Sequence, residues 1–503
     1  MSELFRGFRD RSDAPAVIDD DGETSWRDFD ERVNALIHVV RSHGVQAGER
    51  ISLLSDNRRE IFEVYAAVSQ CGVFVVPINW HFATEEVAYV VENSGSRLVI
   101  VDPSHLEALG DTGIPTLIFG STYEEALAAA GAGEPLSQMM GGVMFYTSGT
   151  TGRPKGVTSS SFSVGTPTSV YSQMAAGLAA LGIPPQGRTL LCGPGYHSAQ
   201  WALSFFPLVG GSTVVVQRKF DPADTLRLID RHQVTNLHLV PTQFIRLLRL
   251  PEDHRASFSG GSLAAVVHGA APCPPEIKRQ MIDWWGPRIT EYYGATEGGF
   301  VSLIGASDWL EHPGSVGRPL PTMEVRIVAD DGTQAAVGEP GVIHVRNLSG
   351  VDFEYLDEPD KTAQAHSVAG YFTLGDIGYL DDQGFLYLSD RRINMIISGG
   401  VNIYPAEIEG VLASHPSVVD VAVFGIPDEE YGERVHATVQ LIPGVDLDDG
   451  QRIDLESFLR AKLASYKVPK DWSSVDQMPR SEAGKLLKAS LRAPYWQHTG
   501  RYI

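Results

Sequence analysis

The sequence predicts an α/β protein: a large amino-terminal domain of layered, largely parallel sheets with flanking helices, then a small, mobile α+β domain. Three observations support this fold class. Short apolar strands alternate with helical stretches along most of the chain. The 503 residues exceed one ordinary domain. The pattern changes after Gly384–Leu388, where a compact unit of about 110 residues begins. We therefore predict domains at 1–390 and 391–503.

The predicted strands of the large domain are short apolar runs separated by helical patterns. A strand at Arg50–Leu54 is followed by a helical stretch at Arg58–Gln70. Pro241 stands where a helix begins, because proline suits the first helical position. The other predicted strands are Leu98–Val101, Gly142–Tyr146, Thr213–Val216, Leu237–Val240 and Leu263–Val267, and a helix is predicted over Pro275–Trp285.

The small domain has its own strand and helix pattern. Its predicted elements are a strand at Ile393–Ile397, a helix at Pro405–Ser414, strands at Val418–Phe424 and Val435–Leu441, and a helix at Ile453–Leu463.

Composition and charge exclude several function classes. Hydrophobic residues make up 43% and charged residues 20%, as in soluble globular proteins. The chain has 40 basic and 62 acidic residues, and its net charge of −22 should repel nucleic acid. An anionic ligand would therefore need local cations and helix amino-termini.

The cysteines and the termini indicate the compartment. Cys71, Cys192 and Cys273 are scattered, which favours neither a disulfide framework nor a zinc site and suits a reducing cytosol. We expect no signal peptide, no peroxisomal address, and no integral membrane segment of about 18 apolar residues. The predicted location is cytoplasmic.

The segment Tyr146–Gly156 is the clearest candidate for a phosphate site. It follows a buried apolar run and combines glycines, hydroxyls and Lys155. Glycine lets backbone N–H groups approach phosphate oxygens, hydroxyls donate further bonds, and the lysine adds charge. The G-K-[ST] ending of a Walker A loop is missing, because Pro154 precedes the lysine and Gly156 follows it. A flexible turn is the alternative interpretation.

This segment resembles, almost letter for letter, the phosphate loop of the adenylate-forming superfamily, which contains acyl-CoA synthetases, luciferases and peptide-synthetase adenylation domains. A second segment, Glu291–Gly298, carries the resemblance further: it implies an aromatic side chain stacked on adenine, a threonine (Thr296) at the α-phosphate, and a glutamate (Glu297) that holds Mg²⁺. A surface acid is the alternative for Glu297. His268–Ala271 is similar to the strand end beside adenine and acid. The implied ATP-binding residues here are Thr147, Ser148, Gly149, Thr150, Thr151, Gly152, Lys155, Gly269, Ala270, Ala271, Glu291, Tyr292, Tyr293, Gly294 and Thr296.

Three later segments extend the resemblance. Asp376 is similar to the ribose-binding aspartate and Arg391 to the arginine that meets the same ribose; a turn residue and a surface ion pair are the alternatives. Gly399 and Gly400 resemble the glycine loop beside the CoA pantetheine, or else form a simple turn. Lys485, rather than Lys488, matches the catalytic lysine. The implied catalytic residues are Lys485, Thr296, Glu297 and His197.

The acid pocket is less clearly specified. His197 falls where the family has an aromatic or histidine gate beside the carboxylate, and a structural histidine is the alternative. The candidate substrate-binding residues are His197, Gln200, Trp201, His268, Gly294 and Gly298. Trp201 and Phe205 are expected to crowd a long acyl chain. One departure concerns the hinge: Ile393 stands where the family usually has Asp or Lys, which puts the ease of domain rotation in question.

The resemblance implies an AMP-forming carboxylate–CoA ligase that uses ATP, Mg²⁺ and CoA on an apolar acyl or aromatic acid. An adenylating enzyme that passes the acyl group to a carrier protein, or to another nucleophile, stays as the alternative. A P-loop phosphotransferase and a non-enzymatic scaffold fit the residues less well. The expected partners are small molecules, with a homodimer as a candidate assembly and no nucleic acid.

Overall fold

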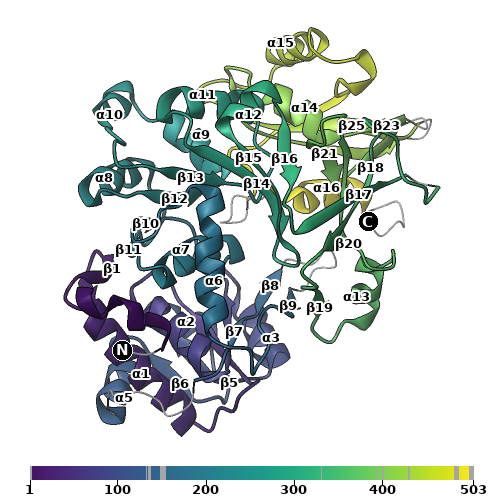
Figure 1. Cartoon of the computed structure of the whole chain (residues 1–503). Helices are drawn as coiled ribbons and strands as arrows, with labels where there is room; N and C mark the ends of the chain where they lie inside the picture. Colours follow the sequence, from purple (N-terminus) through teal and green to yellow (C-terminus); the bar gives the residue numbers. More distant parts are fainter. Residues whose placement is uncertain are drawn as a thin grey trace.

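A computed structural model gives the arrangement of the chain (Figure 1). It describes residues 3–131, 133, 138–147, 154–329, 331–391, 394–398, 401–428, 431–480 and 486–497. In that part of the chain no helix is both long and apolar enough to cross a membrane.

A large mixed sheet runs through the middle of the amino-terminal domain. Its inner strands β11, β10, β12, β13 and β14 are parallel neighbours, and β15 turns the sheet antiparallel. In spatial order the described strands are β17 (Met323–Val328), β18 (Gly341–Asn347), β20 (Phe372–Leu380), β21 (Leu386–Arg391), β16 (Ser315–Pro319), β15 (Gly299–Gly305), β14 (Ile289–Ala295), β13 (Ala265–His268), β12 (Asn236–Leu239), β10 (Arg188–Leu191), β11 (Thr213–Val216), β1 (Pro15–Asp19) and β2 (Gly22–Ser25).

Two smaller sheets complete the large domain. One is parallel throughout, in the order β6 (Thr116–Ile118), β5 (Ser96–Val101), β3 (Arg50–Leu54), β4 (Phe74–Ile78) and β7 (Gly142–Val143). The other is antiparallel and contains β19 (Phe353–Tyr355), β9 (Lys155–Ser159) and β8 (Phe145–Thr147).

Helices cover both faces of the large sheet, as its parallel core requires. The face of β12–β14 that packs on α7 belongs to one apolar cluster, and the face towards α9 and α11 belongs to another. The α-helices of the domain are α1 (Trp26–Ser42), α2 (Glu60–Cys71), α3 (Thr84–Ser94), α4 (Leu106–Leu109), α5 (Thr122–Ala130), α6 (Ser169–Gly177), α7 (Ser198–Val209), α8 (Pro222–His232), α9 (Pro241–Leu248), α10 (Glu252–Ser257), α11 (Pro275–Trp285), α12 (Ala306–Glu311) and α13 (Pro359–Ala365).

The small domain, green to yellow in Figure 1, has its own core around Ile396, Ile408 and Leu455. Arg249, at the end of α9, donates hydrogen bonds to the carbonyl oxygens of Val418 (3.3 Å) and Val419 (2.9 Å) and so links the two domains. The elements are β22 (Ile396–Ser398), β23 (Val401–Ile403), α14 (Pro405–Leu412), β24 (Val418–Asp428), β25 (Gly432–Leu441), α15 (Asp449–Arg460), β26 (Asp471–Ser474) and α16 (Lys488–Trp496).

The predicted fold class is confirmed, but several element boundaries differ. The predicted single strand Gly142–Tyr146 was wrong, because the chain changes sheets at Met144: β7 pairs in parallel with β4, whereas β8 pairs antiparallel with β9. In the small domain the strand predicted from Ile393 begins at Ile396, and residue 393 lies outside the described residues. Strand β21 of the large sheet ends at Arg391, and the exact domain boundary stays a prediction.

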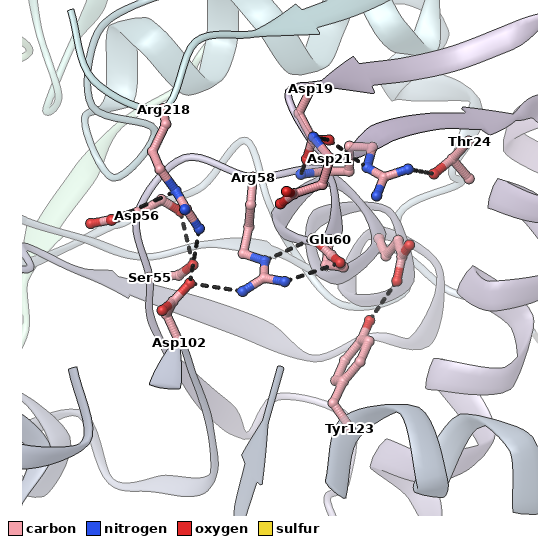
Figure 2. A network of polar contacts seen from close by, with 12 residues as sticks. Asp19, Asp21, Thr24, Ser55, Asp56, Arg58, Glu60, Asp102, Tyr123 and Arg218 are labelled. Atoms are coloured by element: carbon pink, nitrogen blue, oxygen red, sulfur yellow. Dashed lines mark hydrogen bonds and ion pairs between the residues drawn. The ribbon is translucent and has the colours of Figure 1, made fainter. Parts of the chain in front are cut away.

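Charged side chains connect two of the sheets where their strands end (Figure 2). Arg58 lies 2.7 Å from Asp102, which follows β5, and 2.8 Å from Glu60. Arg218, which follows β11 of the large sheet, lies 3.9 Å from both Asp56 and Asp102. In this network, Arg218 is the residue that reaches from the large sheet to the end of the parallel sheet.

Candidate adenylation site

The two ends of the predicted phosphate loop lie opposite each other in a β-ladder. Thr147 of β8 and Lys155 of β9 are register partners. Five predicted ATP-binding residues, Ser148, Gly149, Thr150, Thr151 and Gly152, lie outside the described residues. The ladder nevertheless fixes where that segment starts and ends.

Lys155 and Glu297 are brought together by a tyrosine that the sequence did not single out. The Lys155 Nζ atom lies 5.3 Å from the centre of the Tyr355 ring, and the Tyr355 hydroxyl donates to Glu297 Oε1 at 3.1 Å. Partial burial, together with nearby Lys361, lowers the pKa of Lys155, while Glu358 and Glu297 oppose that shift. A cation and a carboxylate from distant segments therefore share one locality, as a metal-bound polyphosphate requires.

Thr296 is hydrogen-bonded to the first residue of helix α7. Its hydroxyl and that of Ser198, the first residue of α7, are 2.8 Å apart. His197 is the N-cap residue of the same helix, and its ring packs 4.5 Å from that of Tyr196. Helix α7 thus places the predicted gate next to the predicted α-phosphate ligand.

Two predicted substrate glycines are required by packing. A Cβ atom on Gly294 would lie 2.1 Å from the carbonyl oxygen of Gly299, and one on Gly298 would lie 2.5 Å from the Phe372 ring. Gly294 allows the hairpin between β14 and β15 to close tightly, and Gly298 allows Phe372 of β20 to pack against that hairpin.

The predicted nucleoside residues converge on β20 and β21. The Tyr293 hydroxyl donates to Asp376 Oδ2 at 2.7 Å, and Asp376 is buried. Asp376 and Arg391 are register partners on adjacent strands. An aromatic ring, a carboxylate and an arginine position therefore adjoin, which is the arrangement expected for an adenine and its ribose.

The strand end His268–Ala271 has an unusual backbone. Ala270 has φ = +65°, a left-handed conformation that non-glycine residues seldom adopt and that often marks a functional site. A Cβ atom on Gly269 would lie 2.6 Å from the Tyr292 ring, so this residue must be glycine. The turn therefore exposes backbone groups at the carboxyl end of a parallel strand, where ligands bind in such sheets.

The side chains of His268 and Glu291 lie on the opposite face of the sheet. Glu291 Oε2 accepts a 2.6 Å hydrogen bond from Lys278 of α11, and His268 Nε2 is 3.7 Å from the same oxygen. All three side chains are buried. The side chains of Glu291 and His268 therefore stabilise the packing of α11 on the sheet. A ligand would contact these two residues through their backbone atoms.

Gln200 and Trp201 extend along α7 beneath His197. Trp201 is buried in an aromatic cluster formed with Tyr65, Phe145, Phe162, Phe205 and Phe206. Gln200 hydrogen-bonds instead to His238 of β12, at 2.9 Å. The structure therefore places Trp201 in the core, and whether it also contacts substrate stays a prediction.

Three predicted residues, Lys485, Gly399 and Gly400, lie outside the described residues, as does Ile393 of the hinge. The roles assigned to them therefore stay predictions.

The donor set at Glu297 fits Mg²⁺ bound to phosphate. Within the described residues no three His, Cys, Asp or Glu side chains gather to hold a metal. Mg²⁺ commonly keeps several waters and takes one or two protein carboxylates plus substrate phosphates. One carboxylate beside Lys155 suits that mode of binding.

A cavity of about 800 Å³ adjoins this locality between β9, β19 and α13. It is lined in part by Asp352, Glu354, Asp357 and Glu358. This acidic lining disfavours a phosphate ligand, so the cavity is not part of the candidate ATP site.

Sequence reasoning missed Ser198, His238 and Tyr355. A polar residue inside the predicted strand Leu237–Val240 was a signal that could have found His238. No local pattern marks Tyr355, which reaches Glu297 only through tertiary packing.

Comparisons with known proteins agree with this geometry. Residues 4–351 match the family model "AMP-binding enzyme", and residues 407–485 match "AMP-binding enzyme C-terminal domain". A 2-succinylbenzoate–CoA ligase of Bacillus licheniformis is 32% identical over 95% of this chain and 96% of its own length. The fatty acid–[acyl-carrier-protein] ligase ScoC of Streptomyces coeruleorubidus is 28% identical over 97% and 95%.

A solved structure shares this fold over nearly the whole chain. The o-succinylbenzoate CoA synthetase MenE of Bacillus subtilis, in complex with its acyl-adenylate OSB-AMP, has a TM-score of 0.83 and 29% identity, covering 97% of each chain. The chain therefore belongs to the AMP-binding enzyme family, as an acyl-CoA synthetase-like member of the adenylate-forming superfamily in the class of AMP-forming carboxylate–CoA ligases.

Proposed function

We propose that this enzyme activates an apolar acyl or aromatic acid of modest size and transfers it to CoA. The observation that carries the proposal is the convergence of Lys155, Glu297 and Thr296 beside the Tyr293–Asp376 pair. They come from three parts of the chain: Lys155 begins β9, Tyr293, Thr296 and Glu297 lie at or just beyond the end of β14, and Asp376 lies in β20. Together they supply a cation, a hydroxyl, carboxylates and an aromatic ring. That set suits ATP and an acid together.

The chemistry follows from the poor reactivity of a carboxylate. The acid's oxygen attacks the α-phosphorus of ATP, the bond to the bridging oxygen breaks, and pyrophosphate leaves. The resulting acyl-adenylate has a good leaving group. The CoA thiol then attacks the acyl carbon, loses its proton, and releases AMP with the thioester.

The described residues contribute mainly by positioning and charge. Thr296, held by Ser198, presents a hydroxyl to the α-phosphate; Lys155 balances negative charge on the phosphates; and Glu297, held by Tyr355, is the carboxylate that would bind Mg²⁺. When bound, Mg²⁺ would neutralise phosphate charge. His197 stands beside the acid as a gate.

Residues of the small domain complete the proposal. Lys485 would meet the α-phosphate in one domain orientation, and Gly399 and Gly400 would line the path of the CoA thiol. Arg391 and Asp376 would hold the ribose hydroxyls. We also propose Mg²⁺ dependence and a cytoplasmic location, with a homodimer as the candidate assembly; the unpaired Cys71, Cys192 and Cys273 suit a reducing compartment.

Two half-reactions test this proposal. Lys485→Ala should lower pyrophosphate release from acid plus ATP about 100-fold, because one charge contact to the transition state is lost. The same variant, given preformed acyl-adenylate and CoA, should form thioester at close to the parent rate. Lys488→Ala is the matched control and should retain pyrophosphate release. Formation of ADP and phosphate by the parent enzyme would refute adenylation.

Transfer to a carrier protein is the second candidate, supported by the likeness to ScoC. Replacing CoA with a phosphopantetheinylated carrier protein in the second half-reaction distinguishes the two acceptors. Faster thioester formation on the carrier would favour this alternative.

A further inference from the structure

Three buried side chains form a hydrogen-bonded chain on the α7 face of the sheet. Gln200 Nε2 lies 2.9 Å from His238 Nδ1, and His238 Nε2 lies 3.2 Å from the Tyr292 hydroxyl. All three residues are at most 5% exposed. We call Gln200, His238 and Tyr292 the polar floor.

The direction of these hydrogen bonds is fixed. Gln200 Nε2 is also 3.4 Å from the carbonyl oxygen of His238, which only an amide nitrogen can satisfy. Nδ1 of His238 therefore accepts, and Nε2 carries the hydrogen and donates to Tyr292. Burial, with a smaller effect of the nearby His197 charge, lowers the pKa of His238 to about 3, so the ring is neutral.

Two residues of the polar floor lie close in the chain to predicted acid-binding residues. Gln200 follows the gate residue His197 by one turn of α7, on the same side of the helix. Tyr292 precedes Gly294 by two residues in β14, and its ring packs against Phe300 at 4.7 Å. An acyl group that enters between His197 and Gly294 therefore meets these side chains.

The depth available is short. Gln200 is three residues beyond His197 along α7, a rise of roughly 4.5 Å, or about four carbon–carbon steps of an extended chain. The floor also resists displacement. Moving Gln200 or Tyr292 would leave a polar group of His238 buried without its hydrogen bond, and such groups are costly.

Two close approaches confirm that the floor is tightly packed. A Cβ atom on Gly193 would lie 2.0 Å from Gln200 Nε2, and one on Gly269 would lie 2.6 Å from the Tyr292 ring. Both neighbours must be glycine for the floor to keep its position.

We propose that the polar floor closes the acyl-binding space and restricts this enzyme to compact acids, with Gln200, His238 and Tyr292 as its specificity-determining residues. The inference rests on the proposed function, since it assumes that an acid binds between α7 and β14. It selects short acyl and small aromatic acids over long-chain fatty acids.

The test measures binding separately from turnover. Non-hydrolysable 5′-O-(N-acylsulfamoyl)adenosines with acetyl, butyryl, benzoyl, octanoyl and dodecanoyl groups are titrated into the full-length protein by calorimetry. The parent should bind octanoyl and dodecanoyl analogues about 100-fold more weakly than butyryl, because overpacking a rigid site is unfavourable. Gln200→Ala and Tyr292→Ala should each reduce that penalty to about 10-fold or less.

A matched control removes a buried polar contact elsewhere in the same sheet. Thr189 of β10 hydrogen-bonds Asn236 of β12 at 3.2 Å. Thr189→Val should leave the length dependence of the parent intact. Thermal melts verify that each variant is folded, and the two alanine variants act at independent positions.

The outcomes distinguish a failure of the polar-floor proposal from a failure of the proposed function. Equal affinity of the parent for all acyl lengths, or an unchanged penalty in both folded alanine variants, would overturn the floor. Parallel assays of pyrophosphate release with the free acids test the activity itself. Length-dependent analogue binding without pyrophosphate release would support the floor and refute the proposed function.

Discussion

The two faces of strands β12, β13 and β14 bury different kinds of polar chemistry. Towards α7 lies the neutral chain Gln200–His238–Tyr292. Towards α11 lies a charged pair, Lys278 and Glu291, with its atoms 2.6 Å apart. Because strand side chains alternate, adjacent residues of one strand supply both faces.

The difference shows that one face of these strands stabilises the packing of α11, while the other face is suited to lie beside the acid. Burial lowers the pKa of Lys278 and raises that of Glu291, while their mutual attraction opposes both shifts. The Lys278 ammonium also lies 4.7 Å from the Trp309 ring. Such a pair holds α11 to the sheet and cannot lose one member cheaply. The neutral face carries no net charge, so it can adjoin an apolar acyl group.

Removing one partner of the buried ion pair on the charged face should give the largest loss of stability. Lys278→Met leaves Glu291 buried without its cation and should lower the free energy of unfolding by about 3–5 kcal/mol. The double variant Lys278→Met/Glu291→Leu should recover most of this loss, because no buried charge remains. Urea denaturation measures both. A single variant as stable as the parent would show that this face does not depend on its ion pair.

The free energy of unfolding should depend on pH because of His238 on the neutral face. His238 has a folded pKa of about 3, below its ordinary value near 6.5, so between these limits the unfolded chain binds a proton that the folded chain does not. Its contribution to stability is therefore complete above pH 6.5 and falls with pH, by about 2 kcal/mol between pH 6.5 and pH 5. His238→Gln should remove that part of the slope. Denaturation at pH 7 and pH 5 compares parent and variant, and identical slopes would contradict a buried neutral histidine.

The smallest effect should come from removing one hydroxyl from the neutral face. Tyr292→Phe loses the hydrogen bond from His238 but keeps the ring, so the free energy of unfolding should fall by about 1 kcal/mol. The limit on acyl length should persist, since the ring still fills the same space. A melt and the analogue titration measure the two quantities. Relief of the length limit would mean that the hydroxyl, not the ring, excludes longer acids.

Much of the fold was predictable from local pattern. The strand at Thr213–Val216 and the helix at Pro275–Trp285 have the predicted bounds, and Pro241 begins its helix as expected. The motif residues Thr296, Glu297 and Asp376 were identified through their resemblance to segments of the adenylate-forming superfamily. The break at Met144 was not predictable, since a continuous apolar run does not reveal that its two halves pair in different sheets.

The candidate site was predicted as a set of segments but not as a set of contacts. Gln200, Trp201 and His268 were all taken as substrate-facing. The structure places Trp201 in an aromatic cluster, His268 beside the Lys278–Glu291 pair, and Gln200 in the polar floor. Their contacts with substrate stay predictions. Face and depth depend on neighbouring elements, which sequence spacing alone does not specify.

The sequence by itself determined the fold class, the order of the nucleotide segments and the chemical types available to bind ATP. The fold class follows from hydrophobic periodicity, and the nucleotide segments were recognised by their resemblance to adenylate-forming motifs; both signals are carried by local stretches of sequence. Only the tertiary structure decided which side chains meet: Tyr355 with Glu297, Ser198 with Thr296, and His238 with both Gln200 and Tyr292. These contacts join residues far apart in the chain, and the packing of helices on both sheet faces sets their distances.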